Sequence, residues 1–360
     1  MPKFHSLKVR DVRKETEDAV SVSFDVPEDL KEEYSFIQGQ YLTFKKELNG
    51  EEIRRSYSIC RSPLDNDLRV AIKRVEDGLF STYANDQLEV GDVLDVMTPL
   101  GRFYTPIDPD NEKHYVAFAA GSGITPVMAH MRTVLAMEPK SEFTLIFGNK
   151  STSSIIFKEE IEDLKNEYMD RLRVYHVLSR EQNEFPLLFG RIDEEKCNTF
   201  MKYFIQPESI DEVFVCGPAP LIESVRKVMS EAGIDRKKVH FELFASPQQL
   251  AEREGYAKPK REKKEGFQAN VQIILDGVAT DFTMDSEDSN ILDAALKNGA
   301  DLPFACKGGV CATCRAKLDE GKVEMEVNYS LEPDELERGF ILTCQSHPTT
   351  EKVVVNFDEV

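Results

Sequence analysis

The first third of the chain alternates short apolar and polar stretches. Gly, Asn and Asp separate these stretches, as in Asn49-Gly50 and Gly91-Asp92. An apolar residue at every second position is the pattern of a half-buried β-strand, and closely spaced short strands are typical of a barrel or sandwich. We therefore predict an all-β domain over residues 1–108, with strands at Ala19–Val26, Tyr41–Lys45, Leu68–Val75 and Val93–Met97.

Strands and helices alternate in the segment that follows, residues 109–245. An apolar run, Tyr115–Ala120, precedes a glycine-containing turn and a helical stretch at Val127–Met137. Alternation of this kind predicts a parallel sheet with crossover helices. The remaining elements predicted there are strands at Phe143–Phe147, Val174–Leu178 and Glu212–Cys216 and helices at Lys158–Glu167 and Ala219–Ala232.

The last quarter of the chain is a separate segment. Residues 246–266 are polar, poorly periodic and locally basic, and we interpret them as a linker rather than a nuclear or nucleic-acid signal. Residues 267–360 then form a third domain. Its predicted elements are strands at Val271–Leu275, Thr280–Thr283 and Lys352–Phe357 and a helix at Ile291–Asn298, with Ser289 or Asn290 as N-cap and Gly299 as terminator.

Length and composition favour a multi-domain cytoplasmic protein. The 360 residues exceed one ordinary core, and hydrophobic residues make up 41%. The sequence has no apolar run of about 18 residues, the length needed to span a bilayer, and the charged N-terminus lacks the apolar core of a signal peptide. Four of the seven cysteines fall in the last quarter. A reducing cytosol disfavours disulfides, so the cluster of cysteines suggests metal ligation.

The net charge of −20 argues against a nucleic-acid binder. Residues 267–360 hold 7 Lys and Arg against 18 Asp and Glu, a net charge of −11. This acidity is either a solvated surface or a docking face for a basic partner protein. The candidate docking residues are Asp319, Glu320, Glu324, Glu326, Glu332, Asp334 and Glu335.

The strongest chemical motif is CKGGVCATC at residues 306–314, with a distant cysteine in LTCQ. The spacing C-x4-C-x2-C, then 29 residues to the fourth cysteine, is that of plant-type [2Fe–2S] proteins. Gly308 and Gly309 allow the loop to turn its N–H groups toward the sulfurs. Zinc is the alternative, but its sites usually pair two C-x2-C knuckles. We predict that the cluster ligands are Cys306, Cys311, Cys314 and Cys344.

Two motifs of the first domain fit a flavin nucleotide. In RRSYSIC, Arg55 can pair with a pyrophosphate, Tyr57 can form an aromatic wall, and the Ser58 hydroxyl can bond the flavin nitrogen that receives hydride. In the turn that contains Ser81 and Thr82, backbone N–H groups and hydroxyls can hold phosphate at a helix start. An ordinary strand and a capped turn remain the alternatives.

The motif GSGITP follows an apolar strand and opens a helix. Gly121 and Gly123 allow a pyrophosphate to approach the helix N-terminus, although the third glycine of the full dinucleotide motif is missing. FGNK, LSR and VCGP stand at the carboxyl ends of other predicted strands, where ligands bind in parallel sheets. Ser179 and Arg180 of LSR can hold a 2′-phosphate, which favours NADPH over NADH. A surface arginine is the alternative.

In this order, R-x-Y-S, the phosphate turn, G-x-G-x-T-P and C-G-P resemble the ferredoxin–NADP reductase superfamily, followed here by a plant-type ferredoxin domain. The resemblance covers essentially the whole chain. Stretches such as FSTYANDQLEVGDVLDVMTPLGRF and DLPFACKGGVCATCRAKL are similar to the reductase subunits of phenylacetyl-CoA epoxidases. Those subunits serve a separate diiron oxygenase in aerobic phenylacetate breakdown.

The resemblance implies a flavin-binding β-barrel, an α/β parallel-sheet nucleotide domain and an α+β ferredoxin domain of the β-grasp type. It implies that NADPH reduces FAD and that a [2Fe–2S] cluster passes single electrons to an oxygenase. The residues implied for FAD are Arg55, Tyr57, Ser58, Lys73, Ser81 and Thr82. Those implied for NADPH are Gly121, Gly123, Thr125, Ser179, Arg180, Cys216 and Gly217. Glu242 and Phe244 would complete the flavin face, and Ser58, Cys216 and Glu242 are the predicted catalytic residues.

Other interpretations of these motifs stay open. The same reductase could serve a Rieske oxygenase, a steroid hydroxylase or a hybrid-cluster protein. A non-catalytic module could hold zinc in its cysteines and only sense NADP(H). Cys216 could be a small buried hydrophobic residue at a strand end.

Overall fold

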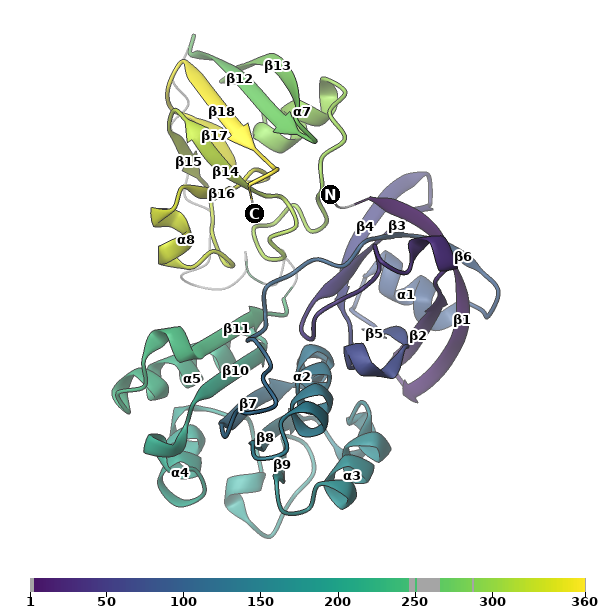
Figure 1. Cartoon of the computed structure of the whole chain (residues 1–360), viewed down its shortest axis with the longest axis vertical. Coiled ribbons are helices and arrows are strands. Elements are labelled where there is room, and N and C mark those ends of the chain that lie inside the picture. The colour runs from purple at the N-terminus through teal and green to yellow at the C-terminus, as the bar shows by residue number, and fades with distance from the viewer. Residues whose placement is uncertain (1–2, 246–249, 251–265, 287, 360) are drawn as a thin grey trace. The chain divides into compact units, whose positions relative to one another are not determined.

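The chain divides into two compact units. The computed structural model describes residues 3–245, 250, 266–286 and 288–359. One unit is Phe4–Phe244, and the other contains Ala245–Val360. Nearly all of the linker predicted at 246–266 lies outside the described residues. Figure 1 labels the helices and strands of both units.

Six antiparallel strands open the first unit, in the sheet order β4-β3-β6-β1-β2-β5. A bridge between Ile59 and Val70, and a hydrogen bond from the Cys60 N–H to the Arg69 carbonyl (3.0 Å), join the two outer strands. The joined edges close the sheet into the predicted barrel. The strands are β1 (Phe4–Thr16), β2 (Ala19–Asp25), β3 (Tyr41–Leu48), β4 (Glu51–Ser58), β5 (Leu68–Lys73) and β6 (Val93–Met97).

The barrel core explains which strands could be predicted. The four strands expected from alternation are confirmed as β2, β3, β5 and β6. The long strand β1 was not predicted, because charged side chains occupy most of its length and Leu7 and Val9 are its fully buried apolar residues. The helix α1 (Leu79–Asp86) packs on the barrel through Phe80, which stacks on Phe44 with 5.7 Å between the ring centroids.

A five-stranded parallel sheet completes the first unit, in the order β11-β10-β7-β8-β9. The sheet and its crossover helices confirm the predicted fold, although α4 and β11 were not foreseen. The strands are β7 (His114–Ala120), β8 (Glu142–Asn149), β9 (Leu172–Leu178), β10 (Glu212–Gly217) and β11 (Val239–Leu243), and the helices are α2 (Ile124–Met137), α3 (Lys158–Glu167), α4 (Glu194–Tyr203) and α5 (Ala219–Glu231).

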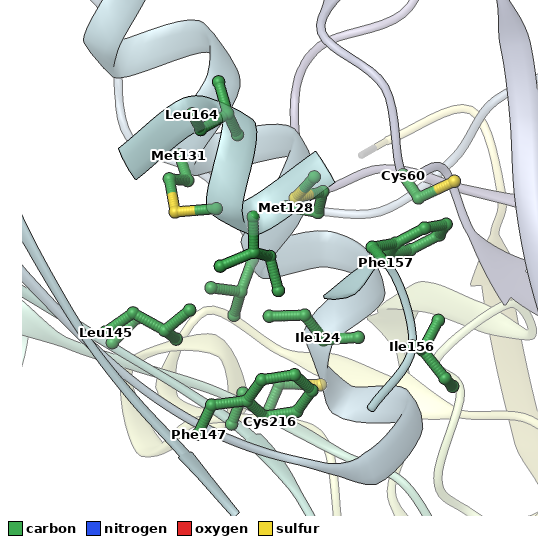
Figure 2. Close-up of a cluster of buried hydrophobic side chains, with 14 of the residues drawn as sticks. Cys60, Ile124, Met128, Met131, Leu145, Phe147, Ile156, Phe157, Leu164 and Cys216 are labelled. Atoms are coloured by element: carbon green, nitrogen blue, oxygen red, sulfur yellow. The ribbon is translucent and has the colours of Figure 1, made fainter. Parts of the chain in front are cut away.

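Helix α2 lies at the centre of the first unit. Eleven of its fourteen residues are buried, so it cannot be a surface helix with one solvated face. Figure 2 shows Ile124, Met128 and Met131 of α2 between side chains of the sheet and the Cys60–Phe157 contact region. The helix therefore contributes to a core that continues from the parallel sheet to the barrel.

Polar contacts also tie the barrel to the nucleotide domain. Arg61 Nη2 donates to Glu160 Oε1 of α3 (2.9 Å), and Arg132 Nε of α2 donates to Asp65 Oδ2 (2.8 Å). We call these two contacts the interdomain ion pairs. The side chain of Arg61 is 7% exposed, so this pair is shielded from the solvent that weakens surface ion pairs.

The second unit holds a mixed sheet in the order β13-β12-β18-β14-β16, in which β12 and β18 run parallel. Helix α7 (Ile291–Lys297) packs on it, and Asn290 is the N-cap, its Oδ1 accepting the Asp293 N–H at 2.8 Å. This is the predicted β-grasp arrangement. The strands are β12 (Gln268–Leu275), β13 (Val278–Asp285), β14 (Arg315–Glu320), β16 (Phe340–Leu342) and β18 (Lys352–Asn356); β15 (Val323–Met325) pairs with β17 (Ser346–Pro348), and α8 is Pro333–Glu337.

Short 3₁₀ turns complete the description of the first unit. They lie at Glu28–Leu30, Pro63–Asp65, Gly121–Gly123, Thr152–Ser154, Pro186–Leu188, Pro207–Ser209 and Arg236–Lys238. None of the helices in the described ranges is long and apolar enough to cross a membrane. The cytoplasmic location inferred from the sequence stays a prediction.

Candidate functional site

The first candidate site joins the barrel to the carboxyl edge of the parallel sheet. Ser58 ends barrel strand β4, and its hydroxyl donates to Oε2 of Glu242 on β11 at 3.1 Å. In the parallel register, Glu242 is the partner of Cys216 on β10. The structure therefore brings together the three residues that were predicted to be catalytic.

Glu242 has an unusual carboxyl group. Burial raises its pKa to about 7, and the hydrogen bond from Ser58 opposes part of that rise. A carboxyl group with this pKa can hold or release a proton near neutral pH.

Cys216 is fully buried among apolar neighbours. Figure 2 places it beside Phe147 and near Ile124, at the lower edge of the hydrophobic cluster. Burial and the nearby carboxyl of Glu242 raise the pKa of the Cys216 thiol well above its usual value. The thiol is therefore neutral, and it is unsuited to act as a nucleophile.

The glycine turn after β7 is shaped mainly by its neighbours. Gly121 adopts a left-handed φ of +54°, which lets the chain reverse into α2. A Cβ on Gly123 would lie 2.1 Å from the Cys216 carbonyl oxygen, so no other residue fits there. Thr125 is 1% exposed and its hydroxyl donates to the Ser122 carbonyl at 3.0 Å, which stabilises the turn from inside.

Gly217 and Phe244 continue the same edge. The Phe244 N–H donates to the Gly217 carbonyl at 2.9 Å, directly after the β10–β11 register. Phe244 is half-buried and packs against the sheet core. Both residues thus stand beside Cys216 and Glu242, as predicted.

The predicted flavin residues of β4 have distinct environments. Tyr57 is half-buried and stacks on Phe80 of α1 at 5.7 Å between ring centroids. Burial raises the pKa of its phenol, so the hydroxyl stays protonated. Arg55 is exposed, and its Nη1 donates to the Arg54 carbonyl at 2.8 Å. The strand therefore presents an aromatic face and a guanidinium on the same side, two residues apart.

The turn into α1 offers backbone rather than hydroxyl groups. Gly78 is the N-cap of α1, and the first intrahelical bond runs from the Thr82 N–H to the Gly78 carbonyl. The three preceding N–H groups have no intrahelical acceptor and point out of the helix start. The Ser81 hydroxyl is buried and braces the turn, accepting from the Val75 N–H (3.0 Å) and donating to the Gly78 carbonyl (3.1 Å).

Lys73 lies where the barrel meets the glycine turn. Its Nζ is 3.9 Å from the position that a Cβ of Gly121 would occupy, and 3.5 Å from Asp18 Oδ2. A cation at this place can reach phosphate groups presented to either turn.

The ends of β8 and β9 form the other part of the carboxyl edge. The N–H groups of Ser179 and Arg180 donate to the carbonyls of Asn149 (2.9 Å) and Lys150 (2.8 Å), and the Arg180 side chain is exposed. Glu181 then accepts from both the N–H (2.7 Å) and the hydroxyl (2.8 Å) of Thr152, and these bonds lower its pKa.

Sequence reasoning missed two residues at this edge. Glu181 ties the loop after β9 to the loop after β8, and nothing in its sequence position signals that bond. Asn149 is 7% exposed, yet neither polar atom of its side chain has a hydrogen-bond partner among the described residues. The FGNK motif marked its strand end, but the unsatisfied amide could be seen only in the structure.

The second candidate site is the cysteine loop of the C-terminal unit. The Gly308 and Cys311 N–H groups point at Cys306 Sγ, with N–S distances of 3.3 and 3.4 Å. Gly309 has a φ of +75°, and left-handed φ values also occur at Lys307 and Ala312. The tight wrapping expected from the two glycines is therefore shared with two other residues.

The four cysteines contact one another in pairs. A hydrogen bond from the Cys311 thiol, with three backbone N–H groups, lowers the pKa of Cys306 to about 6. A hydrogen bond from Cys314 likewise lowers the pKa of Cys344. Over the described ranges, no three His, Cys, Asp or Glu side chains gather around one point that could hold a metal ion. Two thiol pairs surrounded by N–H donors fit a dinuclear centre with two thiolates on each iron better than one zinc ion.

Several acidic candidates near this loop have local partners. The Glu335 side chain is 8% exposed and lies 3.1 Å from Arg315 Nε. Glu326 Oε1 lies 3.0 Å from Nε2 of the buried His347 ring. Glu324, by contrast, is exposed. The expected docking residues Glu335 and Glu326 therefore support the domain itself, whereas Glu324 faces solvent.

Comparison with known families covers most of the chain. Residues 6–107 match the oxidoreductase FAD-binding domain, residues 118–227 the oxidoreductase NAD-binding domain, and residues 273–349 the 2Fe-2S iron-sulfur cluster binding domain. A solved structure of phthalate dioxygenase reductase has the same fold, with a TM-score of 0.58 and 23% identity over 98% of both chains.

Two curated relatives span nearly the full length. One subunit of 1,2-phenylacetyl-CoA epoxidase from Escherichia coli (strain K12) is 44% identical over 358 residues, which is 99% of both chains. The ferredoxin reductase component of 3-ketosteroid-9-alpha-monooxygenase from Rhodococcus rhodochrous is 31% identical over 98% of this chain and 96% of its own. The chain therefore belongs to the family of flavin and iron–sulfur oxidoreductases that includes the phenylacetyl-CoA epoxidase reductase subunit and that carries FAD-binding, NAD-binding and 2Fe-2S domains in one polypeptide.

Proposed function

We propose that this chain is an NADPH-dependent reductase that passes electrons through FAD and a [2Fe–2S] cluster to the oxygenase component of a phenylacetyl-CoA epoxidase. The observation that carries the reaction is the contact between Ser58 and Glu242 beside Cys216. It joins a flavin-type barrel strand to the nucleotide-binding edge in one site. The 44% identity to the Escherichia coli phenylacetyl-CoA epoxidase protein supports the choice of partner.

The barrel would hold FAD. When bound, FAD accepts a hydride from the nicotinamide and releases its electrons singly. Tyr57 would cover the ring and Arg55 would pair with the pyrophosphate. Lys73 and the first N–H groups of α1, around Ser81 and Thr82, would hold the phosphates.

Ser58 and Glu242 would manage a proton at the flavin. The Ser58 hydroxyl has one proton, which it donates to Glu242 while that carboxyl is ionised. Because the pKa of Glu242 is about 7, a protonated Glu242 can donate to Ser58 Oγ instead. The Ser58 proton is then free to bond an acceptor on the barrel side. This reversal would let the pair supply a proton from the buried carboxyl.

The carboxyl edge would hold NADPH. Gly121, Gly123 and Thr125 would form the turn beneath the pyrophosphate, although the close contact between Gly123 and β10 shows that this glycine also serves packing. Cys216, Gly217 and Phe244 would border the nicotinamide. A neutral thiol at Cys216 would place no negative charge against a ring that becomes positive as hydride leaves.

Ser179 and Arg180 would select NADPH. The guanidinium is exposed at the carboxyl end of β9, and Glu181 fixes the backbone beside it. A 2′-phosphate would accept charge-assisted hydrogen bonds there, which NADH cannot do. Preference for NADPH over NADH thus rests on these two side chains.

Cys306, Cys311, Cys314 and Cys344 would hold the cluster. The two thiol pairs and the N–H groups aimed at Cys306 support a dinuclear centre. A purified chain with flavin and this cluster should absorb across the visible range with a yellow-brown colour. A colourless chain would support zinc and a sensing role instead.

The test of function is reconstitution with separate oxygenases. Anaerobically reduced chain would be mixed with the diiron phenylacetyl-CoA epoxidase component, and NADPH use would be compared with epoxide formed. A one-to-one coupling, not found with a 3-ketosteroid 9α-hydroxylating oxygenase, is the expected result. The reverse preference would favour the second candidate, which the 31% identity to the 3-ketosteroid reductase supports.

A further inference from the structure

The residue after the fourth cysteine has a buried side chain that reaches the metal loop. Gln345 is 1% exposed. Its Nε2 lies 3.3 Å from Cys344 Sγ, 3.0 Å from the Lys307 carbonyl oxygen and 2.8 Å from the Cys344 carbonyl oxygen. One amide group therefore contacts a predicted ligand sulfur and the loop that carries the other three ligands.

The direction of this amide follows from its neighbours. Both carbonyl oxygens can only accept hydrogen bonds, so the NH₂ end must face them and hence the sulfur. Turning the amide over would place its oxygen against two carbonyl oxygens. The Oε1 atom is buried without a hydrogen-bond partner in the described ranges, which is a cost to folding. Such an arrangement points to a requirement at the NH₂ end.

The stem of Gln345 is also held in place. Its N–H donates to the Leu342 carbonyl (2.9 Å), and its own carbonyl accepts from the Glu326 N–H (2.9 Å). A Cβ on Gly309 would lie 3.2 Å from Gln345 Cγ, so the side chain packs directly under the glycine of the loop. The amide is thus presented to Cys344 with little freedom to move.

The donors around the four sulfurs are divided among them. Backbone N–H groups of Gly308 and Cys311 point at Cys306, and the Thr313 hydroxyl donates to Cys311 Sγ at 3.2 Å. Cys344 receives the Gln345 amide in addition to a bond from the Gly309 backbone. A donor at a thiolate stabilises negative charge, and a reduced cluster carries one more negative charge than an oxidised one.

We propose that Gln345 sets the reduction potential of the cluster from its Cys344 side, acting as a positioning residue that links the fourth ligand to the loop at Lys307. This inference rests on the proposed cysteine ligands. The amide stabilises the reduced form more than the oxidised form, and so it favours transfer of an electron from the flavin to the cluster.

The test replaces the amide without changing its length. Gln345→Met keeps an unbranched buried side chain but has no N–H donor. In the full-length chain loaded with FAD and cluster, an EPR-monitored redox titration should show about a tenfold lower ratio of reduced to oxidised cluster at a given solution potential. That ratio corresponds to about 59 mV for a one-electron couple. Gln272→Met on β12, whose amide donates to Asp281 (2.9 Å), is the matched control and should leave the ratio unchanged.

A second variant guards against loss of the cluster. Gln345→Glu has the shape of glutamine but replaces the donor with an acceptor, so its ratio should fall further than that of the methionine variant. Iron content and NADPH-to-ferricyanide turnover should match the unaltered chain in both. An unchanged ratio in a fully loaded Gln345→Met chain would overturn the proposal, as would failure of both variants to hold a cluster that Gln272→Met retains. An unaltered chain without a cluster signal would instead refute the proposed ligand set.

Discussion

The cysteines of the two units lie in opposite environments. In the first unit, burial raises the pKa of Cys60 and of Cys197 to about 12, and it raises the pKa of Cys216 well above its usual value. In the second unit, the pKa of Cys306 is lowered to about 6 because thiol and backbone donors surround its sulfur. Both groups of thiols are shielded from water. What differs is whether N–H and S–H groups point at the sulfur, and this decides between a neutral packing group and a ligand.

Exchanging one thiol in each region should have the largest effect. Cys311→Ser should abolish the cluster signal in reduced-state EPR, while NADPH-to-ferricyanide activity survives because flavin alone can serve that acceptor. Cys197→Ser should keep the cluster and lower the free energy of unfolding by about 1–3 kcal/mol, since a hydroxyl replaces a buried thiol. Cytochrome c reduction at full rate by Cys311→Ser would contradict the electron path.

The hydroxyl of Ser58 should matter for the first electron step. Ser58→Ala removes the contact with Glu242 and should slow flavin reduction by NADPH about a hundredfold, the usual cost of one lost transition-state donor. Anaerobic stopped-flow absorbance of the flavin measures this step. Ser56→Ala is the control on the same strand, because that hydroxyl bonds Thr43 Oγ1 at 2.9 Å. Equal rates in the two variants would remove Ser58 from the mechanism.

The charge at Arg180 should matter for only one nucleotide. Loss of a charge-assisted phosphate contact costs about 1.5 kcal/mol, so Arg180→Ala should raise the KM for NADPH roughly tenfold and leave that for NADH unchanged. Steady-state ferricyanide assays with both nucleotides provide the measurement. Arg173→Ala, at the amino end of the same strand, should change neither KM. An unaltered chain that used both nucleotides equally well would refute the assignment.

The buried carboxyl of Glu242 should make stability depend on pH. Its folded pKa of about 7 exceeds its ordinary value of 4.5, so the unfolded chain releases this proton first as pH rises. Stability attributable to Glu242 therefore falls between about pH 4.5 and pH 7, by at most about 3 kcal/mol, and stays constant above that range. Glu242→Gln should remove this fall in thermal unfolding of flavin-free protein. A pH profile identical to that of the unaltered chain would show that the carboxyl is not buried as described.

Salt should affect only the cluster side, and by the smallest amount. Exposed Glu324 lies on β15, and Glu324→Lys should slow electron delivery to the oxygenase a few-fold at low salt, because charge steering is screened over about 10 Å at 0.1 M salt. Glu89→Lys makes the same charge change on the barrel and should have no effect. Delivery rates that stay flat with salt would mean that docking is mainly apolar.

The sequence analysis was most successful where chemistry is local. Four ligand candidates within residues 306–344 declare themselves by spacing, and the amphipathic helix at Lys158–Glu167 begins and ends where predicted. The strands β1 and β11 and the helix α4 were missed, since charged or mixed residues hide their buried faces. Packing supplies that information, and packing involves the whole domain.

The site at Ser58 and Glu242 shows the limit of such prediction. These residues are 184 positions apart, and only the family resemblance linked them before the fold was known. The unsatisfied amide of Asn149 and the loop contact of Glu181 had no sequence signal at all. Likewise, Gly123 is needed because a neighbouring carbonyl approaches to 2.1 Å from its missing Cβ, which no glycine pattern reveals.

The interdomain ion pairs have a consequence for how the nucleotide is received. Arg61 with Glu160 and Arg132 with Asp65 hold the barrel and the parallel sheet together before any ligand arrives. The two halves of the hydride-transfer site are therefore pre-organised, and little of the affinity for NADPH is lost to closing a hinge. The donor and acceptor carbons would meet at a separation that the protein, rather than the dinucleotide, determines.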